Sequence, residues 1–276
     1  MQALRERQAG QPLPSLRRRA ARSAPVTGRL EMTARSVKLG WYREASLRPY
    51  VGRSVFVFGR RDMSYRIIDM ASDPRCGQFA YFRQMTFPFA GITAEIDITD
   101  FMAHRGQRPF FLSFLYAVVR AANAVPQLRR RILEDGTVAE FDWCPPSYTA
   151  MKPDGVYVYC TVEGDLPYED FVALGRRRQR EVLERGTLTE DGDVRSFLFV
   201  SSLPWLHYSQ LQHPAESPDD SNPRISWGKY VTANGRTTLP VSLFVNHALA
   251  DGLHISRFFA NLETELAALT AQWSKP

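Results

Sequence analysis

His247 is the residue whose local sequence best suits it to act as a general base. It follows the apolar run 239–245, which predicts a strand, and it precedes a segment with helical periodicity. An imidazole at the end of a buried strand is partly shielded yet open to a ligand, and it titrates near neutral pH. A single histidine at a strand end is more often one that only satisfies a hydrogen bond in the core, so spacing alone does not assign catalysis to His247.

Asp251 and Gly252 follow His247 by four and five residues, where the predicted strand gives way to a helix. Asp is favoured as a helix N-cap or as the partner of a positive charge, and Gly adopts the backbone angles that a sharp turn requires. The helix is predicted by apolar residues at helical spacing: Leu253, Ile255, Phe258, Phe259, Leu262, Leu266 and Leu269. A strand, a turn and a helix are therefore expected to fix the place of His247.

The composition is that of an ordered globular protein with one main domain. The chain has 276 residues, of which 44% are hydrophobic and 12% aromatic. Its three cysteines, Cys76, Cys144 and Cys160, form no CxxC pair and lack the spacing to histidines that zinc sites show. We therefore expect no metal site, and the sparse, odd cysteine count fits a reducing cytoplasm.

The positive charge is concentrated at the start of the chain. Residues 1–62 contain 13 Arg and one Lys against four acidic residues, which gives this segment a net charge of +10. The other 214 residues have a net charge of −4, so the whole chain has a net charge of +6. The segment is predicted to be a basic, disordered extension, either a solvated tail or an arm that binds a nucleic acid or a membrane surface. The rest is mildly acidic, which disfavours a nucleic-acid partner. The longest apolar run, 110–119, is too short for a membrane span.

Helices and strands alternate along the remainder of the chain. Helices are expected at 74–82, 110–124 and 168–185, and the strands include 91–98, 138–141, 148–151, 156–159 and 196–200. Asp135-Gly136, Asp154-Gly155 and Asn234-Gly235 are hairpin signals. The fold class is therefore predicted as α/β, a two-layer sandwich in which helices flank a mixed, largely antiparallel sheet.

Several separated blocks resemble the chloramphenicol acetyltransferase family. His247-x-x-x-Asp251-Gly252 resembles the HxxxDG signature of coenzyme A-dependent acyltransferases. The order of the other blocks is more specific: Ile68-Asp69 with Pro74-Arg75, 97–101, 108–111, Arg129 to Ile132 with Asp135-Gly136, 147–149, 201–205 and 227–230. The resemblance runs from about Met63 to Leu269, so residues 63–272 are expected to form an acetyltransferase domain.

The resemblance implies an O-acetyltransferase with acetyl-CoA as co-substrate and a small-molecule alcohol as acceptor, with chloramphenicol as the first candidate. It implies that His247 takes the proton of the acceptor hydroxyl as its oxygen attacks the thioester, with no covalent enzyme intermediate. It also implies a cytoplasmic homotrimer with active sites between subunits.

The same resemblance assigns supporting roles to further residues. Asp251 is expected to pair with Arg75 and so to hold the loop that carries His247. Ser226 takes the place of a Thr that binds a water near the transition state, and Arg108 takes the place of a Lys near the coenzyme A phosphate. Two aromatic residues, Tyr148 and Trp205, are assigned to the substrate pocket.

His207 departs from the family pattern. It stands where the family carries a serine that stabilises the tetrahedral oxyanion, and Ser209 lies two residues further on. Loss of one oxyanion donor commonly costs about 10²–10³ in rate. Three alternatives follow: His207 or Ser209 supplies the donor for the expected reaction, the enzyme acetylates a different alcohol, or the protein is a non-catalytic homologue that binds coenzyme A.

Overall fold

The computed structural model describes residues 64–275. The expected basic extension, residues 1–62, lies outside the described residues. Seven strands form a large sheet in the order β2-β10-β8-β7-β5-β6, with β9 paired to β10. Their bounds are β2 (Phe89–Asp97), β5 (Pro146–Met151), β6 (Tyr157–Thr161), β7 (Leu198–Leu203), β8 (Arg224–Gly228), β9 (Val231–Ala233) and β10 (Arg236–Asn246). Within residues 64–275, only the β5–β7 and β7–β8 pairs are parallel, which confirms the predicted mixed, largely antiparallel sheet.

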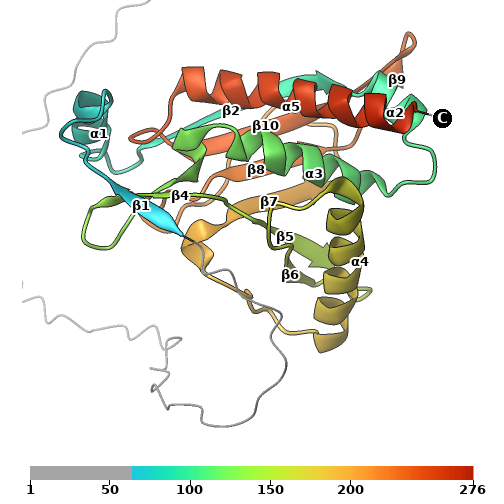
Figure 1. Cartoon of the computed structure of the whole chain (residues 1–276), viewed down its shortest axis with the longest axis horizontal. Helices are drawn as coiled ribbons and strands as arrows, with labels where there is room; N and C mark the ends of the chain where they lie inside the picture. Colours follow the sequence, from blue (N-terminus) through green and yellow to red (C-terminus); the bar gives the residue numbers. More distant parts are fainter. Residues whose placement is uncertain (1–63, 276) are drawn as a thin grey trace, which may run out of the picture. The chain divides into compact units, whose positions relative to one another are not determined.

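Four helices form the second layer of the sandwich, in front of the large sheet (Figure 1). They are α2 (Thr99–His104), α3 (Phe110–Asn123), α4 (Tyr168–Arg185) and α5 (Gly252–Trp273). Helix α3 lies against both α4 and α5, and ten of its 14 residues are buried. The predicted two-layer α/β sandwich is therefore confirmed. Within residues 64–275, no helix is long and apolar enough to cross a membrane.

Strand β10 has a different covering on each of its faces. Val241, Leu243 and Val245 belong to the core shared with the helices. Ser242 and Phe244 alternate with them and are also buried, so they face the opposite side of the sheet. There the segment 204–223 covers them, because the Tyr208 hydroxyl lies 3.3 Å from Ser242 Oγ and the ring of His213 packs near Phe244. The result is a strand buried on both faces.

A second, small sheet lies beside the large one and was not expected from the sequence. It contains β1 (Tyr65–Ile68), β4 (Val138–Phe141) and β3 (Arg130–Ile132) in the order β1-β4-β3. The predicted turn at Asp135-Gly136 does join β3 to β4. The chain then leaves this sheet before β5 because Pro145 and Pro146 interrupt it, and proline has no backbone N–H to continue a ladder. The remaining elements are α1 (Cys76–Phe82) and the short 3₁₀ turns Pro126–Arg129 and Val194–Ser196.

Candidate active site

His247 lies directly after the last residue of β10, as the sequence predicts. Its backbone N–H donates to Pro88 O at 2.7 Å, which continues the pairing of β10 with β2 by one residue. Asn246 then accepts from the backbone N–H of Ala248 at 3.0 Å and turns the chain out of the strand. The backbone of His247 is therefore fixed by the sheet on one side and by this turn on the other.

Arg75 holds the turn that carries His247. Its guanidinium pairs with the Asp251 carboxylate, and Nη2 donates to His247 O at 3.1 Å. The Arg75 side chain is only 10% exposed, whereas the Asp251 side chain is 31% exposed. Burial by itself raises the pKa of Asp251, but the hydrogen bond and charge of Arg75, helped by His254, lower it to about 2. The structure thus brings Arg75, Asp251 and His247 together.

Asp251 also caps helix α5. One carboxylate oxygen accepts from the backbone N–H of Leu253 at 3.0 Å and lies 2.7 Å from Nδ1 of His254. The backbone N–H of Asp251 lies 3.2 Å from the same Nδ1, which is the arrangement of a capping box. Burial lowers the pKa of His254, and the neighbouring carboxylate opposes that shift. Sequence analysis overlooked His254, although its position three residues after an N-cap Asp was the available signal.

Phe82 forms the wall behind the His247 imidazole. The two rings are stacked, with centroids 4.0 Å apart and planes 10° apart. His247 Nδ1 is buried and has no hydrogen-bond partner within residues 64–275. Sequence analysis also missed Phe82. The signal was its spacing of seven residues, or two helical turns, from Arg75, which places both residues on the same side of α1.

Ser226 belongs to a second polar group, on the sheet face covered by the segment 204–223. Its side chain is fully buried on β8, and its Oγ lies 2.7 Å from Nε2 of His213. Burial, together with the charge of Arg224, lowers the pKa of His213. No sequence pattern pointed to His213, because it lies in an irregular polar segment whose path only the fold determines.

His207 and Ser209 are exposed residues of the segment 204–223. His207 Nδ1 is 3.0 Å from Lys229 O, and its Nε2 is 3.6 Å from a carboxylate oxygen of Glu95. A carbonyl oxygen can only accept, so Nδ1 carries a hydrogen in this arrangement. Only Nε2 then remains for a substrate, and it can donate to an oxyanion only when the ring is protonated.

Three further predicted residues lie in different surroundings. Trp205 is 67% exposed in the turn after β7. Arg108 lies between α2 and α3, with its guanidinium 5.0 Å from the centre of the Trp273 ring. Tyr148 is only 1% exposed and packs against Phe111 in the core. In register it matches Val200 and then Ile225, which face the helices, whereas Ser226 faces the other side. Tyr148 and Ser226 therefore lie on opposite faces of the sheet, so the structure does not bring these two predicted substrate-binding residues together within one chain.

Comparison with known proteins shows which family this arrangement represents. A model of the chloramphenicol acetyltransferase family matches residues 63–263. The chain belongs to this family. It is 28% identical over 209 residues to chloramphenicol acetyltransferase 2 of Escherichia coli, covering 73% of this chain and 96% of that protein. It is 23% identical over 205 residues to the enzyme of a Klebsiella species, covering 72% and 92%.

A solved chloramphenicol acetyltransferase also shares the fold. It is 26% identical in sequence, and the match has a TM-score of 0.64 and covers 74% of this chain and 100% of that structure. Within residues 64–275, no three His, Cys, Asp or Glu side chains are grouped as a metal site. In this member of the chloramphenicol acetyltransferase family, the polar side chains gathered around His247 and Ser226 are those of arginine, aspartate, histidine and serine.

The two polar groups of this chain lie far apart. Ser226 pairs in register with Ser242, which is five residues before His247 on β10. At about 3.3 Å per strand residue this separation is roughly 17 Å. No hydrogen bond, ion pair or ring contact joins His247 to His207, Ser209 or Ser226 within the part of the chain that the structure describes. Within one chain, the two polar groups are therefore too far apart to contact the same substrate atom.

Proposed function

We propose that this protein transfers the acetyl group of acetyl-CoA to a hydroxyl of a small molecule, with chloramphenicol as the first acceptor to test. The observation that carries the proposal is the geometry of His247. Its imidazole stands at the end of β10, its carbonyl oxygen accepts from Arg75, and Arg75 pairs with Asp251. Membership of the chloramphenicol acetyltransferase family supplies the reaction class.

His247 acts as the general base in the proposed reaction. An alcohol is a poor nucleophile at neutral pH, and an imidazole within hydrogen-bond reach removes its proton as the new C–O bond forms. The oxygen attacks the thioester carbonyl to give a tetrahedral oxyanion. The C–S bond then breaks, and the sulfur of coenzyme A leaves with the proton that His247 returns. Asp251 and Arg75 do not exchange protons but keep the imidazole in place.

Arg108 is proposed to bind a phosphate of coenzyme A. Its guanidinium packs on the Trp273 ring, which limits the positions that the side chain can adopt. It forms no ion pair with a carboxylate within residues 64–275, so its charge is available to an anion. No metal takes part in the proposed reaction.

We further propose a homotrimer in which each active site lies between two subunits. The separation of roughly 17 Å between Ser226 and His247 in one chain supports this proposal, since both residues can approach one reacting carbonyl only if they come from different copies. The three cysteines of the sequence, Cys76, Cys144 and Cys160, are all free in the structure, in keeping with the proposed location in a reducing cytoplasm.

The test is a thiol-release assay of the purified full chain with acetyl-CoA, with and without chloramphenicol. Release of thiol that requires chloramphenicol, with the acetylated product identified by mass spectrometry, is the expected result. Absence of release with chloramphenicol and with a panel of other small alcohols, from a protein that still binds coenzyme A, would contradict the proposal. It would favour the non-catalytic alternative.

A second candidate function, acetylation of a different alcohol, is favoured by His207. This residue replaces the family's oxyanion serine, and its Nδ1 is already engaged by Lys229 O.

If His207 is the oxyanion donor, His207→Ala should lower kcat by about 10²–10³ with little change in coenzyme A affinity, and His207→Ser should recover much of the rate. A neutral His207→Ala together with an inactive Ser209→Ala would transfer that role to the Ser209 hydroxyl.

A further inference from the structure

Helix α1 controls the surroundings of His247, but apolar burial does not hold it in place. The residue before its first turn, Arg75, donates to the carbonyl oxygen of His247, and its last residue, Phe82, stacks on the imidazole. None of the seven residues of α1 is buried. A helix of this length is not stable by itself, so contacts outside the helix must fix its position.

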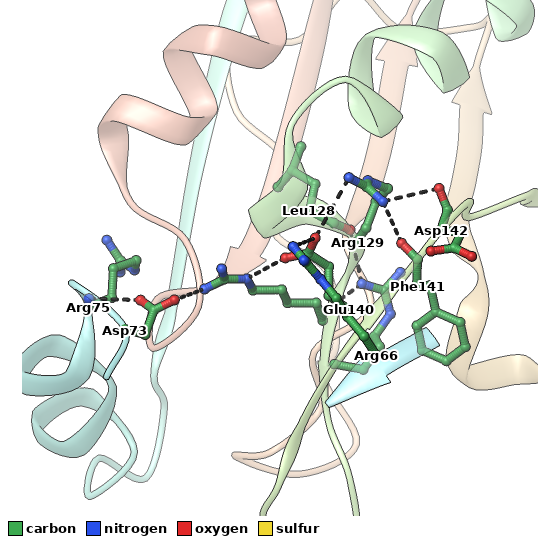
Figure 2. A network of polar contacts seen from close by, with 10 residues as sticks. Arg66, Asp73, Arg75, Leu128, Arg129, Glu140, Phe141 and Asp142 are labelled. Carbon is green, nitrogen blue, oxygen red and sulfur yellow. Dashed lines mark hydrogen bonds and ion pairs between the residues drawn. The ribbon is translucent and has the colours of Figure 1, made fainter. Parts of the chain in front are cut away.

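The start of α1 is held by Asp73. One oxygen of this carboxylate accepts from the backbone N–H of Arg75 at 2.8 Å (Figure 2). The other oxygen lies 2.9 Å from Nη1 of Arg130. The backbone oxygen of Asp73 also accepts from Cys76 N–H at 2.9 Å, which opens the helix. Asp73 thus joins the backbone of Arg75 to a strand of the small sheet.

Arg130 lies between two carboxylates. Its Nε donates to Glu140 at 3.0 Å while Nη1 binds Asp73, and all three side chains are at most 9% exposed. Glu140 is the residue opposite Arg130 in the β3–β4 pair. Arg66, which lies on β1, donates to the other carboxylate oxygen of Glu140 at 2.8 Å. Positively and negatively charged residues therefore alternate from the small sheet to His247, in the order Arg66, Glu140, Arg130, Asp73 and Arg75.

The end of α1 is held by a second ion pair. Arg83 follows Phe82 directly and makes two parallel hydrogen bonds to Asp219, each 2.9 Å long. Asp219 belongs to the segment 204–223, which covers the sheet face around Ser226. This pair is more exposed than the Asp73–Arg130 pair, with side chains 31% and 45% accessible. The Arg83–Asp219 pair should therefore hold α1 less strongly than the Asp73–Arg130 pair does, because water and salt screen exposed charges.

We propose that Asp73, Arg130, Arg83 and Asp219 are positioning residues for His247. The two ion pairs fix both ends of α1, and α1 in turn fixes the Arg75 guanidinium and the Phe82 ring against the histidine. None of the four touches the imidazole. The catalytic consequence rests on the function proposed above for His247, whereas the effect on the geometry of His247 does not. A displacement of about 1 Å in a reacting group can cost about 100-fold in rate, so small movements of α1 are sufficient.

The kinetic test compares three Asp→Asn variants of the full chain. Asp73→Asn and Asp219→Asn each remove one charge from an α1 pair and keep the shape of the side chain. Asp191→Asn is the matched control, because Asp191 forms a similar two-bond pair with Arg185 at the end of α4. We expect kcat to fall by about ten- to hundredfold in Asp73→Asn and by about threefold in Asp219→Asn, with the KM for acetyl-CoA within about twofold of wild type. Asp191→Asn should be unchanged.

A double-mutant cycle tests whether Asp73 and Arg130 act as one unit. Arg130→Lys keeps the charge, but a single ammonium group cannot bind both the Asp73 and the Glu140 carboxylates as the planar guanidinium does. Its kcat is therefore expected to fall as much as that of Asp73→Asn. The double variant should then lose little more than either single variant. Losses that multiply, or an equal fall in kcat for Asp191→Asn, would overturn the proposal in favour of general destabilisation.

A second readout does not depend on activity. With ¹⁵N-labelled histidine, the ring signals of His247, assigned through their loss in His247→Ala, should shift or broaden in Asp73→Asn while those of the exposed His104 stay unchanged. Unchanged His247 signals would overturn the positioning proposal even if the enzyme were active. Shifted signals in a protein that transfers no acetyl group would instead show that the positioning exists and that the proposed function is wrong.

Discussion

Helices α1 and α5 flank the same histidine but are held in place by different forces. Helix α5 has 22 residues, and six of them are buried: His254, Ile255, Phe258, Leu262, Leu266 and Leu269. Helix α1 has seven residues and none is buried. Apolar burial, worth about 1.5–3 kcal/mol per large side chain, therefore holds α5, whereas α1 depends on hydrogen bonds and ion pairs at its two ends.

The difference separates stability from geometry. Burial is strong and non-directional, so α5 can determine whether the loop around His247 is folded without aiming its side chain. Ion pairs and hydrogen bonds are directional, so those at the two ends of α1 can fix where the Arg75 and Phe82 side chains point although the helix itself is not buried. Asp251 connects the two systems, because it caps α5 and binds Arg75.

The largest expected effect belongs to the residue that both helices serve. His247→Ala should lower kcat by about 10²–10⁴, the usual contribution of a positioned general base. Its melting temperature should stay close to wild type because the backbone contacts of His247 do not involve the ring. The measurement is steady-state thiol release together with thermal unfolding. A large loss of stability in this variant would mean that His247 is mainly a structural residue.

Shortening a buried side chain of α5 should lower the stability of the fold more than the same change on α1. Phe258→Ala removes a side chain with no exposed surface and should lower the free energy of unfolding by about 3–5 kcal/mol. Phe82→Ala on α1 should cost less than about 1 kcal/mol but lower kcat severalfold, since it removes the ring stacked on His247. Urea unfolding and kinetics of both variants give the comparison, and Leu253→Ala on the exposed side of α5 is the control. Equal stability losses for Phe258 and Phe82 would contradict the distinction between the helices.

Asp251→Asn should lower stability and activity together. The variant weakens the cap of α5 and leaves the Arg75 charge buried without a partner. We expect a loss of about 2 kcal/mol, less than the 3–5 kcal/mol for a fully buried pair because the carboxylate is 31% exposed. Calorimetry and steady-state kinetics provide the measurement. Normal melting with only a raised KM would show that Asp251 binds substrate and does not hold the loop.

The acid dependence of stability should change in the same variant. The pKa of Asp251 is lowered from 3.8 to about 2 in the folded protein, so its stabilisation is fully present above about pH 4 and is lost as the pH falls towards 2. Wild type should therefore lose more stability than Asp251→Asn between pH 5 and 2 when urea midpoints are compared. Parallel curves for the two proteins would contradict the lowered pKa.

The smallest expected effect is the response of α1 to salt. The Arg83–Asp219 pair is partly exposed, and about 1 M salt shortens the screening length to about 3 Å. With both substrates saturating, wild-type kcat should fall about twofold between low and high salt, and Asp219→Asn should show a smaller fall. If the variant responds as strongly as wild type, this pair does not position α1.

The sequence by itself determined the elements that depend on local periodicity. The apolar run before His247, the Asp251-Gly252 turn and the apolar stripe after it predicted β10, the cap and α5. The expected helices 110–124 and 168–185 agree closely with α3 and α4. These predictions succeed because hydrogen bonds within a helix or turn and the alternation of side chains involve residues close in sequence. The Arg75–Asp251 contact was anticipated from family resemblance, and no local pattern predicts it.

Tertiary structure decided the features that join distant parts of the chain. Tyr148 lies in a strand buried on both faces, so only its pairing with β7 shows that it points to the helices and away from Ser226. The small sheet and the ion pairs of α1 likewise join segments far apart in sequence, 136 residues for Arg83 and Asp219. The physical reason is that a charged side chain in a sequence has many possible partners, and only the packing of whole elements selects one.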